Sequence, residues 1–284
     1  MRVTLRRSFS CVAVGFISAS SFVWPAIAVD IAPPEFAPTP TVGWIAQGAE
    51  FLPPPSGPGP VMNDPAHPRI SNAVATATGQ QPTFHIGDAN SPILQPWAAE
   101  QMRKRNAEVL GGKPGYTRQV SCWPVGVPTF LLYPVQPIYF VQTPKQVLMI
   151  SQEDHMVRHI YMNQAHSAHP KPSWYGESVG HYEGDTLVVD TIGQNDRNWV
   201  DNYRTPHTSA LHVTERFRIV DGGKTLEASV HVEDAGAFIT PWNAIQRYRR
   251  AEQGPIVESF CAENNANFFN YDMDPMPRAD KPDF

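Results

Sequence analysis

Charged side chains are scarce in this sequence, and long apolar runs are almost absent. Asp, Glu, Lys and Arg make up 17% of the 284 residues and hydrophobic types 42%, which excludes a disordered polyelectrolyte and allows one or two globular domains. After residue 28 no apolar run reaches the ~18 residues of a membrane span. The sequence also lacks a phosphate-binding Gly loop, a dinucleotide fingerprint, a CxxC pair, a haem motif and an HExxH helix. We therefore expect no bound cofactor.

The first 28 residues have the pattern of a secretory signal. Arg2, Arg6 and Arg7 precede an apolar stretch over 11–23, and the small-x-small triplet at 26–28 is a cleavage site. Cleavage leaves 256 residues and takes the formal net charge from −5 to −8, because the removed segment carries three Arg and no acid. An acidic chain argues against nucleic acid as a partner. We expect a periplasmic or secreted protein with no membrane contact after signal cleavage.

Cysteine is also rare. Cys11 lies in the predicted signal, so only Cys122 and Cys261 remain after cleavage. In an oxidising compartment this pair predicts one disulfide, which contributes about 4 to 5 kcal/mol in the chain-entropy model because it closes a long loop. The alternative is two buried free thiols.

Proline is concentrated near the N-terminus instead of being spread along the chain. Residues 33–68 hold 11 of the 29 prolines. Fixed φ angles and missing N–H donors favour an extended, polyproline-like backbone there. We predict an extended arm over 29–90, and apolar residues such as Trp44 and Ile45 indicate that part of it docks on the domain.

One helix and eight strands are predicted after the arm. The helix is expected over 96–110, because Pro96 suits a first turn and Gly111 with Gly112 ends the pattern. Short runs rich in Val, Ile, Tyr, Phe and Thr follow, separated by turn residues, and these predict strands. The runs are 138–142, 147–152, 156–163, 187–192, 211–220, 226–233, 242–250 and 256–261.

The alternation within the later runs defines the fold class. In 211–220 and 226–233 apolar residues alternate with polar ones, so one face is core and the other is solvent. Hairpin spacing without helical patterns after residue 138 fits an antiparallel barrel of lipocalin or calycin type, or a bent sandwich, with room inside for one small ligand. We place this mainly β domain, with its leading helix, at 91–265, and an irregular C-terminal tail at 266–284.

Four strings resemble a known family. They are QTPKQVLMISQEDHMVRHIYMN at 142–163, GESVGHYEGDTLVVDTIGQND at 176–196, HTSALHVTERFRIVD at 207–221 and CAENN at 261–265. Together they are similar to a widespread family of secreted bacterial proteins, over roughly residues 90 to 265. The resemblance implies an exported β-rich domain without an established substrate. The turn YEGDTLVVD also resembles strand starts in small lipocalin-like barrels.

Glu215 is the sharpest anomaly in the strand pattern. Its parity puts a carboxylate on the apolar face of 211–220, where an isolated charge costs several kcal/mol unless it is paired, hydrogen-bonded or protonated. It is either a general acid or base, a ligand anchor, or half of a structural salt bridge with Arg158. The run 156–163 has polar residues on both faces, so a one-residue slip would exchange Arg158 for His159.

The favoured function is small-molecule binding inside the barrel. The loop between Gly193 and His207 is longer than a hairpin needs and mixes carboxamide, carboxylate and aromatic groups, as binding loops at a barrel mouth do. Two Trp would form the walls of the pocket and a polar pair, Arg158 with Glu215, its anchor. The residues predicted to contact the ligand are Arg158, Asn195, Asp196, Trp199 and Trp242.

Two enzymatic alternatives remain open at this point. In the first, His155 or His207 exchanges protons with Glu215 and a bound substrate, in lyase, isomerase or hydratase chemistry that needs no metal. In the second, Glu153, His155 and His207 hold a metal ion for hydrolysis. The sequence leaves the choice between carrier and enzyme open, and likewise the oligomeric state.

Overall fold

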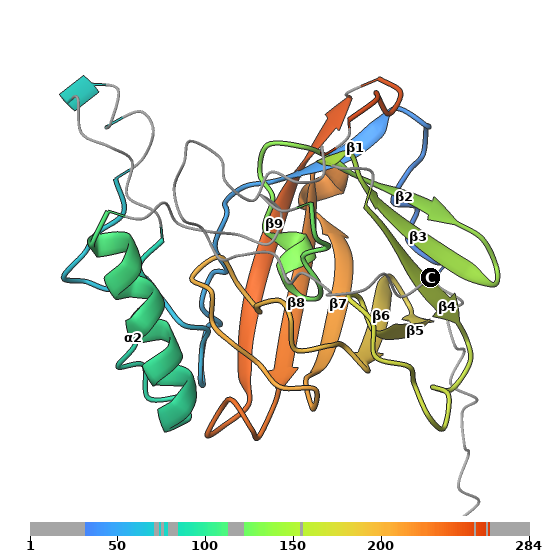
Figure 1. Ribbon diagram of the computed structural model, residues 1–284. Coiled ribbons are helices and arrows are strands. Elements are labelled where there is room, and N and C mark those ends of the chain that lie inside the picture. Colours follow the sequence, from blue (N-terminus) through green and yellow to red (C-terminus); the bar gives the residue numbers. More distant parts are fainter. Residues whose placement is uncertain are drawn as a thin grey trace, which may run out of the picture. The chain divides into compact units, whose positions relative to one another are not determined.

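The computed structural model of the protein contains a closed β-barrel (Figure 1). The structure describes residues 32–70, 74, 77–78, 85–112, 122–153, 156–252, 254–259 and 261. All of these belong to one unit that starts at Ile31. The predicted signal at 1–28 and the predicted tail at 266–284 lie outside the described residues.

The nine strands of the barrel pair in chain order, and β9 closes the barrel by pairing with β1. Every pair is antiparallel except β4 with β5, which run parallel. This confirms the predicted barrel class, with one parallel seam added. The strands are β1 (Val42–Ala46), β2 (Ile138–Gln142), β3 (Gln146–Ser151), β4 (Val157–Met162), β5 (Glu177–Glu183), β6 (Thr186–Ile192), β7 (His212–Val220), β8 (Thr225–Glu233) and β9 (Trp242–Glu252).

Two of the strands escaped prediction. Strand β1 lies inside the segment expected to be an arm, yet all five of its residues are buried between β2 and β9. Strand β5 contains Gly180 and charged ends, which hide its pattern. A methyl group at Gly180 would lie 2.8 Å from Ile160 Cγ2, so glycine is needed where β5 crosses β4 closely. The close approach of β5 to β4, and not a local strand propensity, explains why this position requires glycine.

The predicted strand at 256–261 is wrong. Residues 256–259 have no strand structure, and β9 ends at Glu252. Because β9 is already paired with β8 on one side and β1 on the other, the barrel has no free edge that could accept another strand.

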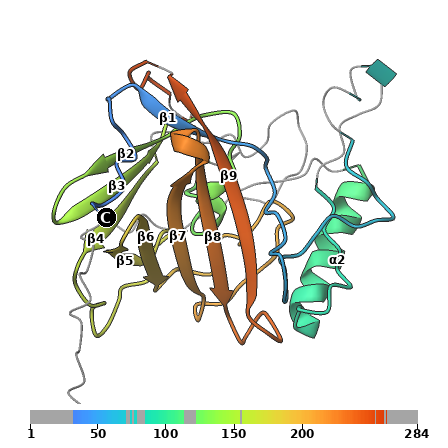
Figure 2. The ribbon, with the colours of Figure 1, turned by 180° about the vertical axis from the view of Figure 1, so that it is seen from behind.

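Helix α2 (Pro96–Leu110) has the predicted bounds, with Pro96 in its first turn and Gly111 as its C-cap. Its buried face is formed by Ala98, Met102 and Asn106, four residues apart, together with Ala99. The helix lies beside the barrel on the side of β9, as the two opposite views show (Figures 1 and 2). Gln95, at its N-terminus, donates its backbone N–H to Ala237 in the β8–β9 connection, 2.9 Å away.

The interior of the barrel is packed with the protein's own side chains. The inward faces of the strands contribute residues such as Trp44, Met149 and Phe217, all with at most 1% of their surface exposed. A 3-10 helix (Thr129–Leu131) reaches the same interior, where Tyr248 Oη of β9 donates to the Leu131 carbonyl at 2.9 Å. A second 3-10 turn (Asp221–Gly223) joins β7 to β8.

Candidate functional site

Inside the barrel, Arg158 of β4 and Glu215 of β7 form a fully buried ion pair, with neither side chain exposed to solvent. Arg158 Nη1 donates to Glu215 Oε1 at 2.9 Å, and Arg158 Nη2 donates to Glu215 Oε2. Arg158 Nη2 also donates to Thr191 Oγ1 at 2.9 Å and to Ser178 Oγ at 3.2 Å, from β6 and β5. The expected partner of Glu215 is therefore the actual one.

This pair has little capacity left for a ligand. The guanidinium forms a bidentate contact with the carboxylate, and its Nη2 also donates to the hydroxyls of Ser178 and Thr191. These two hydroxyls hydrogen-bond each other at 2.8 Å. Burial raises the pKa of the Tyr248 phenol, and the negative charge of nearby Glu215 adds to this increase. Of the alternatives for Glu215, the geometry agrees with a structural salt bridge.

His207 lies apart from Glu215 in the loop before β7. Its Nδ1 is 2.8 Å from the Thr208 carbonyl and its Nε2 is 2.5 Å from Asn198 Oδ1. The Asn198 amide is oriented by donating Nδ2 to the Val125 carbonyl at 3.1 Å. Burial lowers the pKa of His207, against the Thr208 hydrogen bond. Glu215 is not among the hydrogen-bond partners of His207 in the described residues, so His207 and Glu215 do not form an acid–base couple. The other predicted imidazole, His155, lies outside the described residues.

The two tryptophans expected as pocket walls are both core residues. Trp242 packs between Phe51 and Phe238, at centroid distances of 6.2 and 5.8 Å. Trp199 is buried with the Arg105 guanidinium 5.4 Å from its ring centroid.

Two residues of the predicted binding loop point elsewhere. Asp196 is exposed. Asn195 is half-buried and uses its side-chain oxygen to accept the Arg197 backbone N–H at 3.1 Å. The predicted ligand contacts that the structure describes therefore lie in different surroundings, with Arg158 in the buried ion pair and Asp196 on the surface.

Trp199 borders a small cavity of about 10 Å³ with Asp201 and Arg204. This volume holds one water molecule and no organic ligand. Burial raises the pKa of Asp201 to about 6, against hydrogen bonds from Thr205. Burial lowers the pKa of Arg204 to about 10, and its φ of 65° is unusual for a residue other than glycine.

The proposed metal site lies partly outside the described residues. Glu153 and His207 are both described, and no group of three His, Cys, Asp or Glu within the described ranges could hold a metal ion. The third proposed ligand, His155, is not among the described residues. Nor does any described helix have the length and apolar character needed to cross a membrane.

An aromatic groove of about 350 Å³ lies on the outside of the barrel, over β4. Strand β4 alternates, so Arg158 and Ile160 point inward while Val157, His159 and Tyr161 point outward into the groove. The opposite wall comes from two loops that approach β4. The lining residues are Pro124, Val157, His159, Tyr161, Ser173, Trp174, Tyr175 and Gly176.

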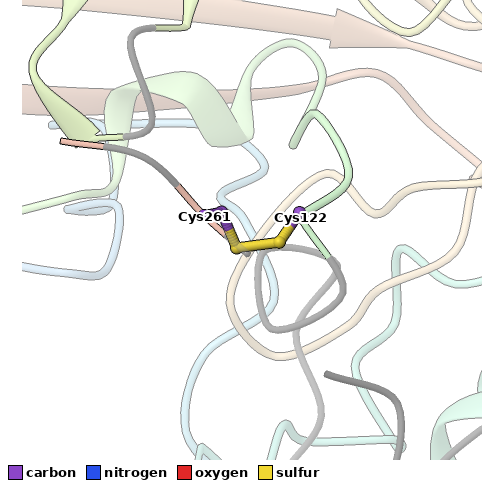
Figure 3. Close-up of a disulfide and its surroundings, with 2 residues drawn as sticks. All are labelled: Cys122 and Cys261. Atoms are coloured by element: carbon purple, nitrogen blue, oxygen red, sulfur yellow. A yellow bond between two sulfur atoms is a disulfide. The ribbon is translucent and has the colours of Figure 1, made fainter. Parts of the chain in front are cut away.

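The loop walls of the groove are anchored at several points. Cys122, two residues before Pro124, is joined by a disulfide to Cys261, with Cα atoms 5.4 Å apart (Figure 3). This confirms the predicted pairing. Trp123 packs against Trp174 at a centroid distance of 5.3 Å. Ser173 is held by its N–H, which donates to the Gly193 carbonyl at 3.1 Å.

A row of histidines and carboxylates runs across the outer faces of β5 to β8. His166, in the β4–β5 crossover, lies with Nδ1 3.0 Å from Glu177 Oε1 and Nε2 2.6 Å from Asp190 Oδ1. His212 lies with Nε2 2.7 Å from Asp190 Oδ2 and Nδ1 3.0 Å from Glu233 Oε2. We call these five residues the His–carboxylate array.

The array shifts the pKa values of its members. Burial lowers the pKa of His212, but the hydrogen bonds and charges of Asp190 and Glu233 outweigh it and raise that pKa. Burial raises the pKa of Asp190, but the hydrogen bonds and charges of His212 and His166 lower it by more. The pKa of Asp190 therefore lies below its usual value. Hydrogen bonds from Ser167 and His166 lower the pKa of Glu177.

Sequence reasoning missed both of these surface features, although each left a trace. On β4 the aromatic residues His159 and Tyr161 occupy the parity opposite to the apolar face, which is unusual for a strand facing only water. In β6 and β7, Asp190 and His212 also occupy the outer parity. The loop partners Trp174 and His166 gave no such signal.

No family model matches this chain, and a search of curated proteins finds no match to it.

Proposed function

We propose that this protein is an exported small-molecule-binding protein whose ligand lies in the aromatic groove on the outside of β4. The observation that carries the proposal is the groove itself, with a volume of about 350 Å³ and three aromatic side chains, Tyr161, Trp174 and Tyr175, in its walls. Ligand pockets are commonly concave, of about 300 to 1,000 Å³, and lined by aromatic groups with a few polar ones.

The lining chemistry favours a neutral, ring-shaped ligand. None of the eight lining residues carries a carboxylate, an ammonium or a guanidinium group. Hydrogen bonds to a ligand are available from the exposed Tyr161 hydroxyl and from the imidazole of His159. The Ser173 hydroxyl donates to the Gly176 carbonyl at 3.2 Å and can still accept a hydrogen bond. The volume lies at the low end for ligand sites, so it suits one or two fused rings.

The side chain of His159 is already oriented. Gln146 Nε2 lies 2.8 Å from His159 Nδ1, and the imidazole stacks on the Tyr161 ring at a centroid distance of 6.5 Å. With the Gln146 amide donating, Nδ1 accepts and the proton of a neutral imidazole lies on Nε2. His159 would then offer one N–H donor to the ligand.

A ligand-observed NMR screen tests the proposal. Indole, p-cresol and methyl glucoside would represent neutral rings, and benzoate and anilinium would represent charged ones. We expect saturation transfer to neutral rings, abolished by Trp174→Ala and weakened by Tyr161→Ala. Trp97→Ala is the matched control, since Trp97 is also partly exposed but lies on α2. Equal binding by the Trp174→Ala and Trp97→Ala variants would exclude the groove as the ligand site.

The proposal that the protein is exported rests on two features. The pattern at 1–28 is that of a signal, and the Cys122–Cys261 disulfide is typical of an oxidising compartment. Fractionation of expressing cells with N-terminal sequencing would test it. A product beginning near residue 29 outside the cytoplasm is expected, and an uncleaved cytoplasmic chain would contradict it.

A catalytic function at the same groove is the second candidate, and it depends on His159. An imidazole in an aromatic groove next to a tyrosine hydroxyl can act as a general base or acid on a bound ring. His159→Gln separates the two functions, because glutamine retains hydrogen bonding but cannot exchange protons near neutral pH. Ligand binding should be largely kept in this variant for either function. For an enzyme, the wild type turns over the ligand identified in the screen and the variant does not, whereas for a carrier neither protein changes the ligand.

A further inference from the structure

The His–carboxylate array contains more acceptors than neutral imidazoles can satisfy. An ionised carboxylate only accepts hydrogen bonds, and a neutral imidazole has a single N–H. Both ring nitrogens of His166 face carboxylate oxygens, and so do both ring nitrogens of His212. All four contacts are hydrogen bonds only when both rings carry two protons.

The charges around the array point the same way. Three carboxylates converge from β5, β6 and β8, and the facing cations are the two imidazoles. A third imidazole, His231 of β8, lies 3.3 Å from Glu233 Oε1 and also contacts Asn243 of β9. The remaining polar contacts, Ser167 from the crossover and Thr214 from β7, are neutral. Loss of the imidazole protons would leave three negative charges facing one another.

The array also connects the β4–β5 crossover to the barrel. In the crossover, His166 binds β5 and β6, while Ser167 donates its N–H and its hydroxyl to the Glu177 carboxylate at 2.7 Å each. The two strands it joins are paired through three residue pairs, in the parallel seam of the barrel. Besides the array, Asn163 at the start of this segment is held by its N–H, which donates to the Gly180 carbonyl at 2.7 Å. The described hydrogen bonds that hold the middle of the segment are those of His166 and Ser167 in the array.

We propose that the His–carboxylate array is a pH-responsive clasp, which holds residues 163–170 on the outer face of β5 to β8 while His166 and His212 are doubly protonated and releases them when the imidazoles lose a proton. The raised pKa of His212 supports this direction. The stabilisation that protonated His212 gives to the array is complete below the usual histidine pKa of about 6.5. It is lost as pH rises through the raised pKa of His212.

The clasp works independently of the groove. Ser173, where the crossover reaches the groove wall, is held by backbone hydrogen bonds to Gly193 and Asn195 that do not titrate. Ligand binding in the groove is therefore expected to stay constant while the clasp opens. Failure of the ligand screen would leave the clasp untouched, and failure of the clasp would leave the groove untouched.

Hydrogen exchange of the full chain between pH 5.5 and 8.5, corrected for the intrinsic pH dependence of exchange, tests the clasp. Protection of the Ser167 amide, which donates to Glu177 in the array, should fall at least severalfold as pH rises. Nitrogen-15 NMR of the imidazoles should show both nitrogens of His166 and of His212 protonated at pH 6. Protection that stays flat across this range would overturn the proposal.

Asp190→Asn is the informative variant, and His181→Gln is its control. An Asn amide accepts from one imidazole and donates to the other, so the central contacts no longer need a proton on each ring, and the pH step should shrink at least severalfold. His181 is an exposed histidine of β5 whose partner is Glu183 rather than an array member, so its variant should keep the full step. An unchanged step in Asp190→Asn would refute the clasp.

Two further outcomes decide the matter. Should Asp190→Asn not fold, His166→Gln replaces it, because His166 is the crossover imidazole that contacts Glu177 and Asp190. Its amide cannot titrate, so protection of 163–170 should become low and independent of pH. Imidazole nitrogen shifts that change when EDTA is added to the purified protein would assign the array to a metal ion and overturn the proton clasp.

Discussion

Two groups of polar and charged side chains both include residues of strands β6 and β7 but lie on opposite sides of the barrel wall. The inner group joins Arg158 to Glu215 with no solvent exposure. The outer group joins His212 to Asp190, each about one-third exposed. Thr191 of the inner group and Asp190 of the outer one are consecutive residues of β6. The alternation of side chains along a strand is therefore enough to send neighbouring polar residues into different environments.

The difference between the two groups is one of desolvation. Inside the barrel, a charge that loses its partner has no water to replace it, so each member depends fully on the others. On the outer face, water and salt screen the charges, and the same type of contact contributes little to stability but can titrate. The inner group therefore supports the fold, while the outer group responds to conditions.

Glu215→Ala should have the largest effect of the substitutions that test this comparison. It leaves the Arg158 guanidinium buried without its carboxylate, and removal of one partner of a buried pair costs about 3 to 5 kcal/mol of unfolding free energy. Urea denaturation followed by circular dichroism measures it. Glu227→Gln, which breaks an exposed pair with Arg247, is the control and should cost about 0 to 1 kcal/mol. Equal losses in the two variants would contradict the distinction between inside and outside.

The double variant Arg158→Met with Glu215→Leu sharpens the same comparison. It removes both charges from the interior and leaves apolar groups of similar size. Stability should recover to within about 1 to 2 kcal/mol of the wild type, because well-packed apolar replacements of buried pairs are often neutral or stabilising. A double variant as unstable as Glu215→Ala would mean that the strand geometry itself depends on the ion pair.

Thr191→Val should have a smaller effect, and Thr214→Val the smallest. The hydroxyl of Thr191 accepts a hydrogen bond from buried Arg158 at 2.9 Å, so its loss should cost about 1.5 to 3 kcal/mol. The hydroxyl of Thr214 donates to half-exposed Asp190 at 3.3 Å, and its loss should change stability by about 0.5 kcal/mol or less. Chemical denaturation of both variants in parallel would show whether this order holds.

The dependence of stability on pH should come from the outer group. The raised His212 pKa gives a contribution that is complete below about 6.5 and is lost as pH rises through the raised value. The lowered pKa values of Asp190, Glu177 and Glu233 give contributions that are present above 3.8 to 4.5 and are lost as pH falls through the lowered values.

The difference between the wild-type and Asp190→Asn stability curves isolates this contribution. It should be greatest between about pH 4.5 and 6.5, where carboxylates and imidazoles are both charged. His159→Gln, which changes an exposed imidazole outside the array, should leave the wild-type curve unchanged. A difference that is constant from pH 4 to 9 would mean that Asp190 acts through packing and not through charge.

Prediction from sequence succeeded where the signal is local. The alternation in 211–220 identified the inward face of β7 and marked Glu215 as buried, and Pro96 with Gly111 identified both ends of α2. It failed for β1, whose proline-rich surroundings resemble an arm, and for β5, whose glycine is required by a neighbouring strand. In both failures, pairing with a distant strand outweighed local propensity.

The candidate sites were predicted less well than the fold. The interior was expected to hold a ligand, but core side chains such as Trp44, Met149 and Phe217 fill it and Glu215 is occupied by Arg158. The groove and the array lie instead on the outer face, where each joins strand residues to loop residues.

The sequence by itself determined the strand parity of β7 and β8, the helix, and the availability of Cys122 and Cys261 for one disulfide, because these depend on residue types and on spacing along a few turns of backbone. Only the tertiary structure decided that the register of β4 turns Arg158 and not His159 toward Glu215, and that a segment before the helix closes the barrel. It also decided that His159 and Trp174 line one groove and that His166 contacts Asp190. These contacts depend on strand register and on the path of the crossover. Both follow from simultaneous burial of many distant side chains, which no short stretch of sequence specifies.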